Sequence, residues 1–160
     1  MIFQSSLVCR GFTLCYGSYV PNETMSHPNT GNGIANQAAY LYFGNVTASQ
    51  NGTNIEMLAG QVNDLSSFID APTEFKAGDS GAAWLAINPT PSTKKYDITV
   101  APIGNSVVTS SSSECVILCV DGSIDCNGKV VNKMQYTRVR NSTSVNLNIP
   151  DNSVALIMTA

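Results

Sequence analysis

The stretch Glu114–Gly128, ECVILCVDGSIDCNG, decides the fold class of this chain. Cys115–Val120 is an unbroken apolar run, and a run this short between turn residues is typical of a strand buried on both faces. Asp121-Gly122 closes it with a turn signal, because glycine tolerates the positive φ that a tight turn requires. Ser123–Cys126 then predicts a short return strand before a second hairpin signal, Asn127-Gly128. We therefore expect a central β-meander in an all-β protein.

The rest of the second half repeats this pattern of short strands and turns. In Ser144–Ile149 three aliphatic residues alternate with polar ones, which predicts a strand with one buried and one solvated face. Turn signals recur at roughly 8–12-residue intervals, the spacing of an antiparallel β-sandwich or jelly roll. We expect residues 1–160 to form one such domain, in which residues 1–20 supply N-terminal strands or an assembly arm.

Residues 54–69 are the one candidate for a helix. Thr53 or Asn54 could cap it, whereas Gly60 disfavours it by about 1 kcal/mol. Two short strands are the alternative. Five apolar residues carry the helical spacing: Ile55, Leu58, Val62, Leu65 and Ile69.

Composition excludes several classes of partner. Charged residues make up 12% of the 160 residues, and the formal net charge is −3. The 8 Lys and Arg residues are scattered, so no basic face for nucleic acid is expected. No apolar run approaches the ~20 residues of a membrane span, so we expect no membrane partner either.

The five cysteines leave two interpretations open. Cys9 and Cys15 could pair across a hairpin, and Cys126 could reach Cys115 or Cys119. Alternatively they are buried free thiols that act as small hydrophobic residues. No second Cys or His pair has zinc spacing, and we expect neither a metal nor another cofactor.

Tyr96–Met158 resembles the cupin family, in the runs CVILCVDGSIDCNGKVV, NKMQYTRV and RNSTSVNLNIPDNSVALIM. It is similar to the last half of the cupin-like domains of phosphomannose isomerases. The resemblance implies a small jelly roll. A metal-binding cupin carries His-x-His and a Glu ahead of the central strand, whereas this chain has Ser110–Ser113, with Glu114 one residue out of place. This departure implies a cupin without a metal.

Gly78–Gly81, the sequence Gly-Asp-Ser-Gly, resembles the nucleophile loop of chymotrypsin-like serine proteases. The only histidine, His27, lies in the polar stretch 21–37, which we expect to be a loop. Only 79 residues precede Ser80, too few for that family's two barrels. We expect a β-turn between two strands here, and keep a Ser80-based hydrolase only as a remote alternative.

The composition resembles that of accessory structural proteins of virus particles, above all of tailed bacteriophages. Low charge combined with abundant Asn, Ser, Thr and Gly carries this resemblance. It implies a non-enzymatic virion protein that decorates a capsid or builds a fibre or tail. Its partners would be a major capsid protein and further copies of itself, such as a trimer.

Two sets of residues are candidates for binding. Met1, Ile2 and Phe3 start the chain with apolar side chains, which would gain about 1.5–3 kcal/mol each if buried against a neighbour. They could instead form the first strand of the chain's own sheet. The alternative function is carbohydrate binding or adhesion, and it would use aromatic side chains that stack on sugars or else pack in the core: Trp84, Tyr40 and Tyr42.

Overall fold

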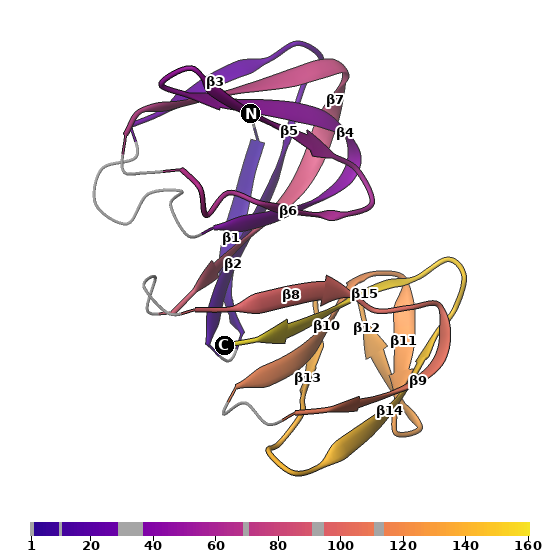
Figure 1. The fold of residues 1–160 in the computed structure, drawn as a ribbon. Helices are drawn as coiled ribbons and strands as arrows, with labels where there is room; N and C mark the ends of the chain where they lie inside the picture. Colours follow the sequence, from indigo (N-terminus) through magenta and orange to yellow (C-terminus); the bar gives the residue numbers. More distant parts are fainter. Residues whose placement is uncertain (1, 10, 29–36, 69–70, 91–94, 111–113) are drawn as a thin grey trace. The chain divides into compact units, whose positions relative to one another are not determined.

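The computed structural model describes residues 2–9, 11–28, 37–68, 71–90, 95–110 and 114–160, with the backbone alone for residues 2–9. These residues form fifteen strands and no helix (Figure 1). The chain divides into two compact units: unit 1 is Met1–Val8 with Phe12–Thr93, and unit 2 is Cys9–Gly11 with Lys94–Ala160. The expectation of a single domain stays a prediction.

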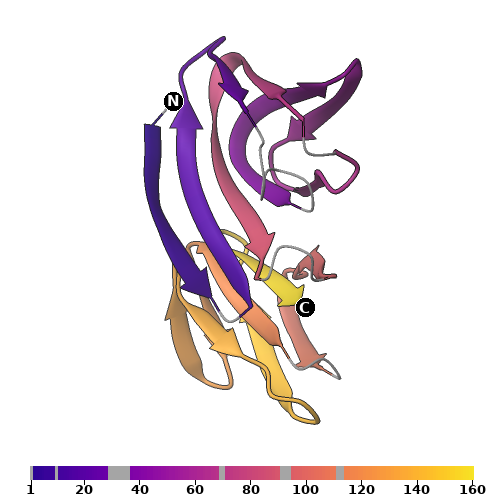
Figure 2. The ribbon, with the colours of Figure 1, turned by 90° about the vertical axis from the view of Figure 1, so that its left-hand side faces the viewer.

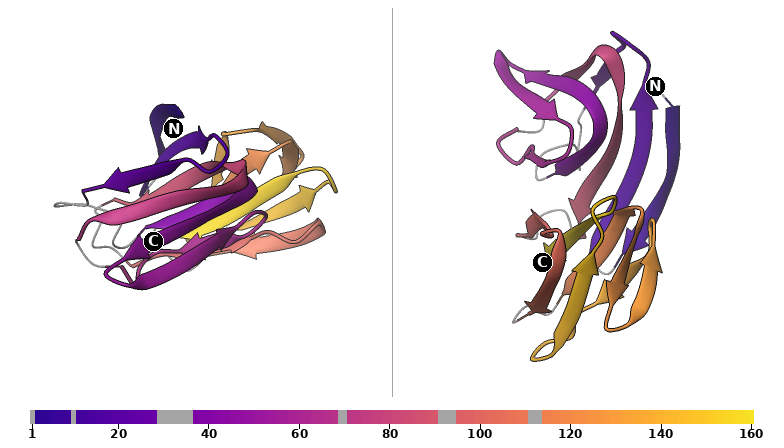
Figure 3. Two further views of the ribbon diagram at one scale, coloured as in Figure 1. Left: turned by 90° about the horizontal axis from the view of Figure 1, so that it is seen from above. Right: turned by 90° about the vertical axis from the view of Figure 1, so that its right-hand side faces the viewer.

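Unit 1 is built on one seven-stranded sheet of order β1-β2-β7-β4-β5. Strand β3 pairs with β7, and β6 pairs with β4, in both cases antiparallel. Figure 2 shows the strong bend of β4 (purple), and the right-hand view of Figure 3 shows it from the opposite side. The strands are β1 (Ile2–Cys9), β2 (Phe12–Tyr19), β3 (Thr24–His27), β4 (Ala38–Gln50), β5 (Thr53–Leu58), β6 (Val62–Asp64) and β7 (Thr73–Pro89).

Two irregularities between β4 and β7 accompany this bend. The register shifts between Leu41 and Phe43, and again between Gly44 and Val46. At the second shift β7 carries extra residues, since Gly44 pairs with Ala82 and Val46 with Ala77. Extra residues of this kind bend a strand and raise its local twist. The concave face of the bent sheet encloses the apolar core of unit 1, which includes Leu41, Val46, Met57, Leu65 and Phe75.

Unit 2 is a jelly roll of two four-stranded sheets (Figure 1). One sheet has the order β13-β10-β15-β8 and the other β12-β11-β14-β9. Successive strands alternate between the sheets, except for the β11–β12 hairpin within one sheet. The strands are β8 (Asp97–Val100), β9 (Gly104–Thr109), β10 (Cys115–Asp121), β11 (Ser123–Cys126), β12 (Lys129–Asn132), β13 (Tyr136–Arg138), β14 (Ser144–Ile149) and β15 (Val154–Thr159).

The buried strand predicted at Cys115–Val120 is confirmed as most of β10, since every one of its residues is at most 1% exposed. The hairpin at Asn127-Gly128 is confirmed as well, and both residues have positive φ. The meander is wrong at its first turn. Strand β10 pairs with β13 and β15, whereas β11 pairs with β12 and β14, so Asp121-Gly122 carries the chain from one sheet to the other.

The helix considered over residues 54–69 is wrong, and the alternative of two short strands is what the structure shows. β5 pairs with β4 along its whole length, and β6 follows a turn in which Gly60 has φ of +80°. The helical spacing included Leu58, which is 45% exposed, while Met57 is buried on the strand's inner face. Ile69 lies outside the described residues.

The first strands of the chain lie where the sequence predicted them. Ile2 and Phe3 belong to β1, which stands at one end of the strand order beside β2. This is the alternative in which the terminus joins the chain's own sheet. Met1 lies outside the described residues, and assembly through this segment stays a prediction. No segment that the structure describes is a helix of the length and hydrophobicity that crossing a bilayer requires.

Candidate ligand-binding cavity

Unit 1 contains a cavity of about 320 Å3 on the concave side of its sheet. This volume lies at the lower end of the range of small-molecule sites. Five strands line it: β7 at the centre, β2 and β3 paired with β7, and β4 and β5 beyond it. The lining residues are Cys15, Tyr19, Met25, His27, Gln37, Ala39, Val46, Met57, Leu65, Phe75, Trp84 and Ala86.

Trp84 contributes both an aromatic ring and a hydrogen-bond donor to the residues that line this cavity. Its ring lies 6.2 Å from that of Tyr19, centroid to centroid, with a tilt of 36°. Its indole Nε1 is buried and has no hydrogen-bond partner within the described structure. A buried donor without an acceptor costs about 1–3 kcal/mol, so a ligand atom that accepts this hydrogen bond would recover part of that cost.

Burial keeps two other lining groups in their neutral forms. It raises the pKa of the Tyr19 phenol to about 12. It also raises the pKa of the Cys15 thiol, which favours the protonated and less nucleophilic form. Both groups can therefore donate a hydrogen bond at neutral pH.

The chemistry of the wall favours an uncharged ligand. None of the lining residues named above is an aspartate, glutamate, lysine or arginine. A charged ligand would lose its hydration here without a lysine, arginine, aspartate or glutamate to pair with. The wall therefore suits a compact apolar molecule with a small number of hydrogen-bonding atoms.

Sequence reasoning missed most of this site. Thr24–His27 was assigned to a polar loop, which is wrong: it forms β3 and brings His27 to the cavity. Cys15, Gly17 and Tyr19 are every second residue of β2. Because side chains two residues apart on a strand share a face, this spacing is the signal that could have placed them together.

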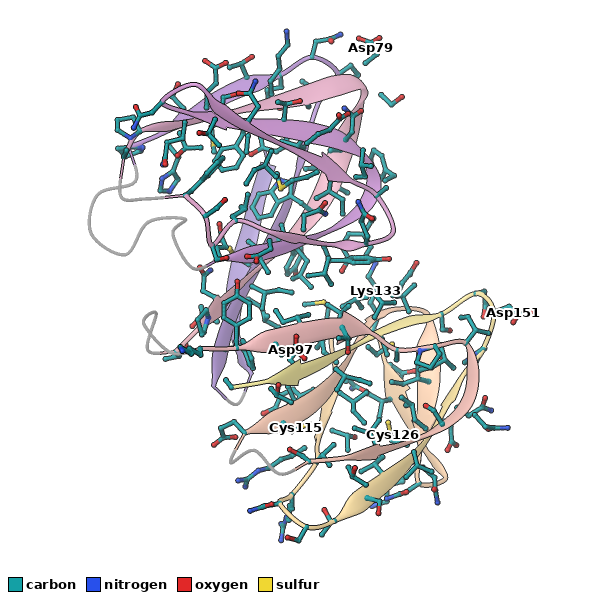
Figure 4. All side chains as sticks on the ribbon, in the orientation of Figure 1. Asp79, Asp97, Cys115, Cys126, Lys133 and Asp151 are labelled. Carbon is teal, nitrogen blue, oxygen red and sulfur yellow. The ribbon has the colours of Figure 1, made fainter. Side chains whose placement is uncertain are left out.

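The Gly-Asp-Ser-Gly sequence is not the predicted turn between two strands. Gly78–Gly81 lies inside β7, in the part that bulges away from β4, and Figure 4 shows Asp79 at the periphery of unit 1. His27 lies in β3 and pairs with Thr73, which lies on β7, the strand that also carries Ser80. Seven residues, about 23 Å of extended strand, separate Thr73 from Ser80. His27 lines the cavity while Ser80 is exposed, so the two are not brought together.

The three aromatic residues considered for sugar stacking do not share one surface. Trp84 lines the cavity, whereas Tyr40 and Tyr42 do not. Those two contact each other edge to face at 5.4 Å, and Tyr40 is only 4% exposed. Stacking on Tyr42 or Trp84 singly stays a prediction.

The residues of unit 2 do not fit the histidine-based metal site of a cupin. Its interior is aliphatic apart from the thiols of Cys115, Cys119 and Cys126, and burial raises the pKa of each. Figure 4 labels Cys115 and Cys126 between the two sheets. Within the described residues no three His, Cys, Asp or Glu side chains are grouped to hold a metal. Ser110 is described, while Ser111, Ser112 and Ser113 lie outside the described residues.

The cysteines with described side chains are free thiols. They are the three of unit 2 and Cys15. Three of these are buried and Cys15 is half-buried.

A second hollow, of about 360 Å3, lies on the outer face of one sheet of unit 2. The register places Asn105, Asn148 and Asp125 in one row across β9, β14 and β11. Neighbouring strands are about 4.8 Å apart, so three polar side chains stand side by side. This amide-lined groove can exchange several hydrogen bonds with a polyhydroxylated ligand.

The sequence matches no protein-family model and no curated protein. Solved structures do match its fold. A cupin 2 conserved barrel domain protein from Leptotrichia buccalis is 10% identical, with a TM-score of 0.56 over 98% of this chain and 87% of that one. HutD from Pseudomonas fluorescens is 12% identical, with a TM-score of 0.63 over 93% of this chain and 79% of that one. An oxalate decarboxylase is 8% identical, with a TM-score of 0.59 over 94% of this chain and 69% of that one.

These similarities correct the functional expectation. The interpretation as a virion accessory protein is wrong, because these similar structures are cupin-like proteins of bacterial origin and not virion proteins. The fold alone does not decide between enzyme and non-enzyme, since one of the similar structures is a decarboxylase and folds host many functions. This chain has an all-β, antiparallel, cupin-like jelly-roll fold.

Proposed function

We propose that this protein is a non-enzymatic binding module whose unit 1 holds a small, uncharged and largely apolar molecule. The single observation that carries the proposal is the cavity of about 320 Å3, whose wall is apolar except for a few groups that can form hydrogen bonds. A well-formed apolar pocket with a few converging polar groups is the usual form of a small-molecule site.

The groups available for chemistry support binding rather than catalysis. Burial holds the Cys15 thiol in its protonated form, which is a poor nucleophile. His27 in β3 lies opposite Thr73, seven residues before Ser80 on β7, so it cannot act as that hydroxyl's base. The apolar wall instead favours binding of an apolar ligand, whose surface it removes from water.

Filling the cavity tests the proposal. Ala86 lines the cavity, and Ala83 lies on the same strand without lining it. We expect naphthalene to shift the methyl NMR signals of Met25 and Met57 in the native protein and in Ala83→Leu, but not in Ala86→Leu. Naphthalene-2-sulfonate should bind far more weakly, because its charge finds no lysine or arginine among the lining residues. Equal binding of naphthalene by both variants, or equal binding of the sulfonate, would refute the proposal.

A second candidate function is carbohydrate binding, for which the amide-lined groove of unit 2 is better suited than the three aromatic residues. Its row of Asn105, Asn148 and Asp125 offers donors and acceptors for pairs of sugar hydroxyls. We expect neutral oligosaccharides on a glycan array to bind the native protein and Asn132→Ala but not Asn148→Ala. No binding by any of the three proteins, or no difference between the variants, rules this function out.

A further inference from the structure

Trp84 lines the cavity and carries a hydrogen-bond donor for which the described structure offers no acceptor. Its Nε1 is buried and unpartnered within the described structure, and its ring packs against Tyr19. Protein interiors rarely leave such a donor without an acceptor, and each exception calls for an explanation. An acceptor supplied by a bound molecule is an explanation that also accounts for the cavity beside the ring.

We propose that the molecule bound in unit 1 is an uncharged aromatic compound whose carbonyl oxygen accepts a hydrogen bond from Trp84 Nε1. This inference rests on the proposed binding function of the cavity. The flat surfaces of Phe75, Trp84 and Tyr19 suit an aromatic ring system. A neutral carbonyl is favoured over a carboxylate, because no lysine or arginine is among the lining residues to pair with it.

The Tyr19 phenol has a separate part in this arrangement. Burial raises its pKa to about 12, so the hydroxyl remains a neutral donor throughout the physiological range. This hydroxyl can therefore donate to a second acceptor on the ligand, while the indole donates to the carbonyl oxygen.

Two probes with one ring system isolate this determinant. Fluorene and 9-fluorenone differ in a single carbonyl oxygen, and each is smaller than the cavity. The two probes also differ in hydration. We therefore divide the association constant of fluorenone by that of fluorene for each protein, and then divide the value for the native protein by the value for Trp84→Phe. We expect this ratio to be about 3- to 10-fold, the range of one net hydrogen bond.

The sequence offers a direct second measurement, because Trp84 is the only tryptophan. Its indole N–H gives a single NMR resonance, which fluorenone should place further downfield than fluorene does, because only fluorenone accepts its hydrogen bond. This measurement needs only the native protein, so the test survives if Trp84→Phe does not fold.

The outcomes separate this inference from the proposal beneath it. If both probes shift the methyl signals of Met25 and Met57 but the indole resonance responds to neither, the carbonyl inference is wrong and the binding function stands. If neither probe shifts the methyl signals, the binding function fails with it. If the native protein and Trp84→Phe prefer fluorenone over fluorene equally, the proposed role of Trp84 is wrong.

Discussion

Gly44 and Gly81 meet where β4 and β7 lose their register. Both residues have positive φ, +75° and +73°, a backbone conformation that side chains rarely adopt. A Cβ on Gly44 would overlap the carbonyl oxygen of Gly81, and a Cβ on Gly81 would lie 2.5 Å from the carbonyl oxygen of Tyr19. Backbone geometry thus explains the last glycine of the Gly-Asp-Ser-Gly sequence.

Gly81→Ala should therefore be strongly destabilising. Strained backbone of this kind costs about 1–3 kcal/mol, and the clash with backbone atoms adds to it. Gly52→Ala is the matched control, because Gly52 has φ of +80° but open space around its Cα. Urea denaturation should show a clearly larger loss of unfolding free energy for Gly81→Ala. Equal losses would show that steric contact at the bulge is unimportant.

Tyr19 predicts a pH dependence of stability. An exposed tyrosine has a pKa near 10, while burial raises that of Tyr19 to about 12. The unfolded chain therefore releases this proton first, so the free energy of unfolding should fall as pH rises from about 10 to 12. Tyrosinate absorbance should show that Tyr19→Phe loses a group that titrates late, near pH 12. A variant that instead loses a group titrating near pH 10 would contradict the burial of this phenol.

Among the elements, the β5–β6 turn depends on a buried amide. Asn63 is 7% exposed and its Nδ2 donates to the carbonyl oxygens of Ala39, Leu58 and Gln61 at 3.1–3.3 Å. Its Oδ1 accepts from the backbone N–H of Leu58 at 3.1 Å. The Asn63 side chain thus supplies hydrogen-bond partners to backbone groups around this turn.

Asn63→Leu should lower the free energy of unfolding by about 1–3 kcal/mol, because it leaves buried backbone groups without partners. Asn54→Leu, on the exposed face of β5, should change it by no more than about 0.5 kcal/mol. Thermal or urea unfolding measures both variants. A native-like stability of Asn63→Leu would mean that water or another group replaces the amide.

Prediction from sequence succeeded where an element is specified by its own residues. Cys115–Val120 and Ser144–Ile149 carry the burial pattern of their strands in their own sequence, and Asn127-Gly128 encodes its turn. The cavity could not be predicted in this way. Its walls come from five strands, and they converge because of bulges at positions such as Gly44, which no periodicity reveals.

At the scale of the whole molecule, the start of the chain carries the prediction about assembly. We expect a homo-oligomer, and Ile2 and Phe3 in β1 are the predicted contact. Light scattering of the intact chain and of a chain lacking residues 1–5 tests this. A folded monomer after deletion, from an oligomeric parent, supports the assembly role. A monomeric parent that merely loses stability on deletion shows that β1 serves the chain's own sheet.

The central claim is that unit 1 is a cupin-like sheet bent around a site for an uncharged aromatic molecule. A crystal structure of the protein grown with 9-fluorenone tests it most directly. The account predicts fluorenone density among Met57, Phe75 and Trp84, with its carbonyl oxygen within hydrogen-bonding distance of Trp84 Nε1. Fluorenone bound only elsewhere, or a unit 1 interior filled by the protein's own side chains, would contradict it.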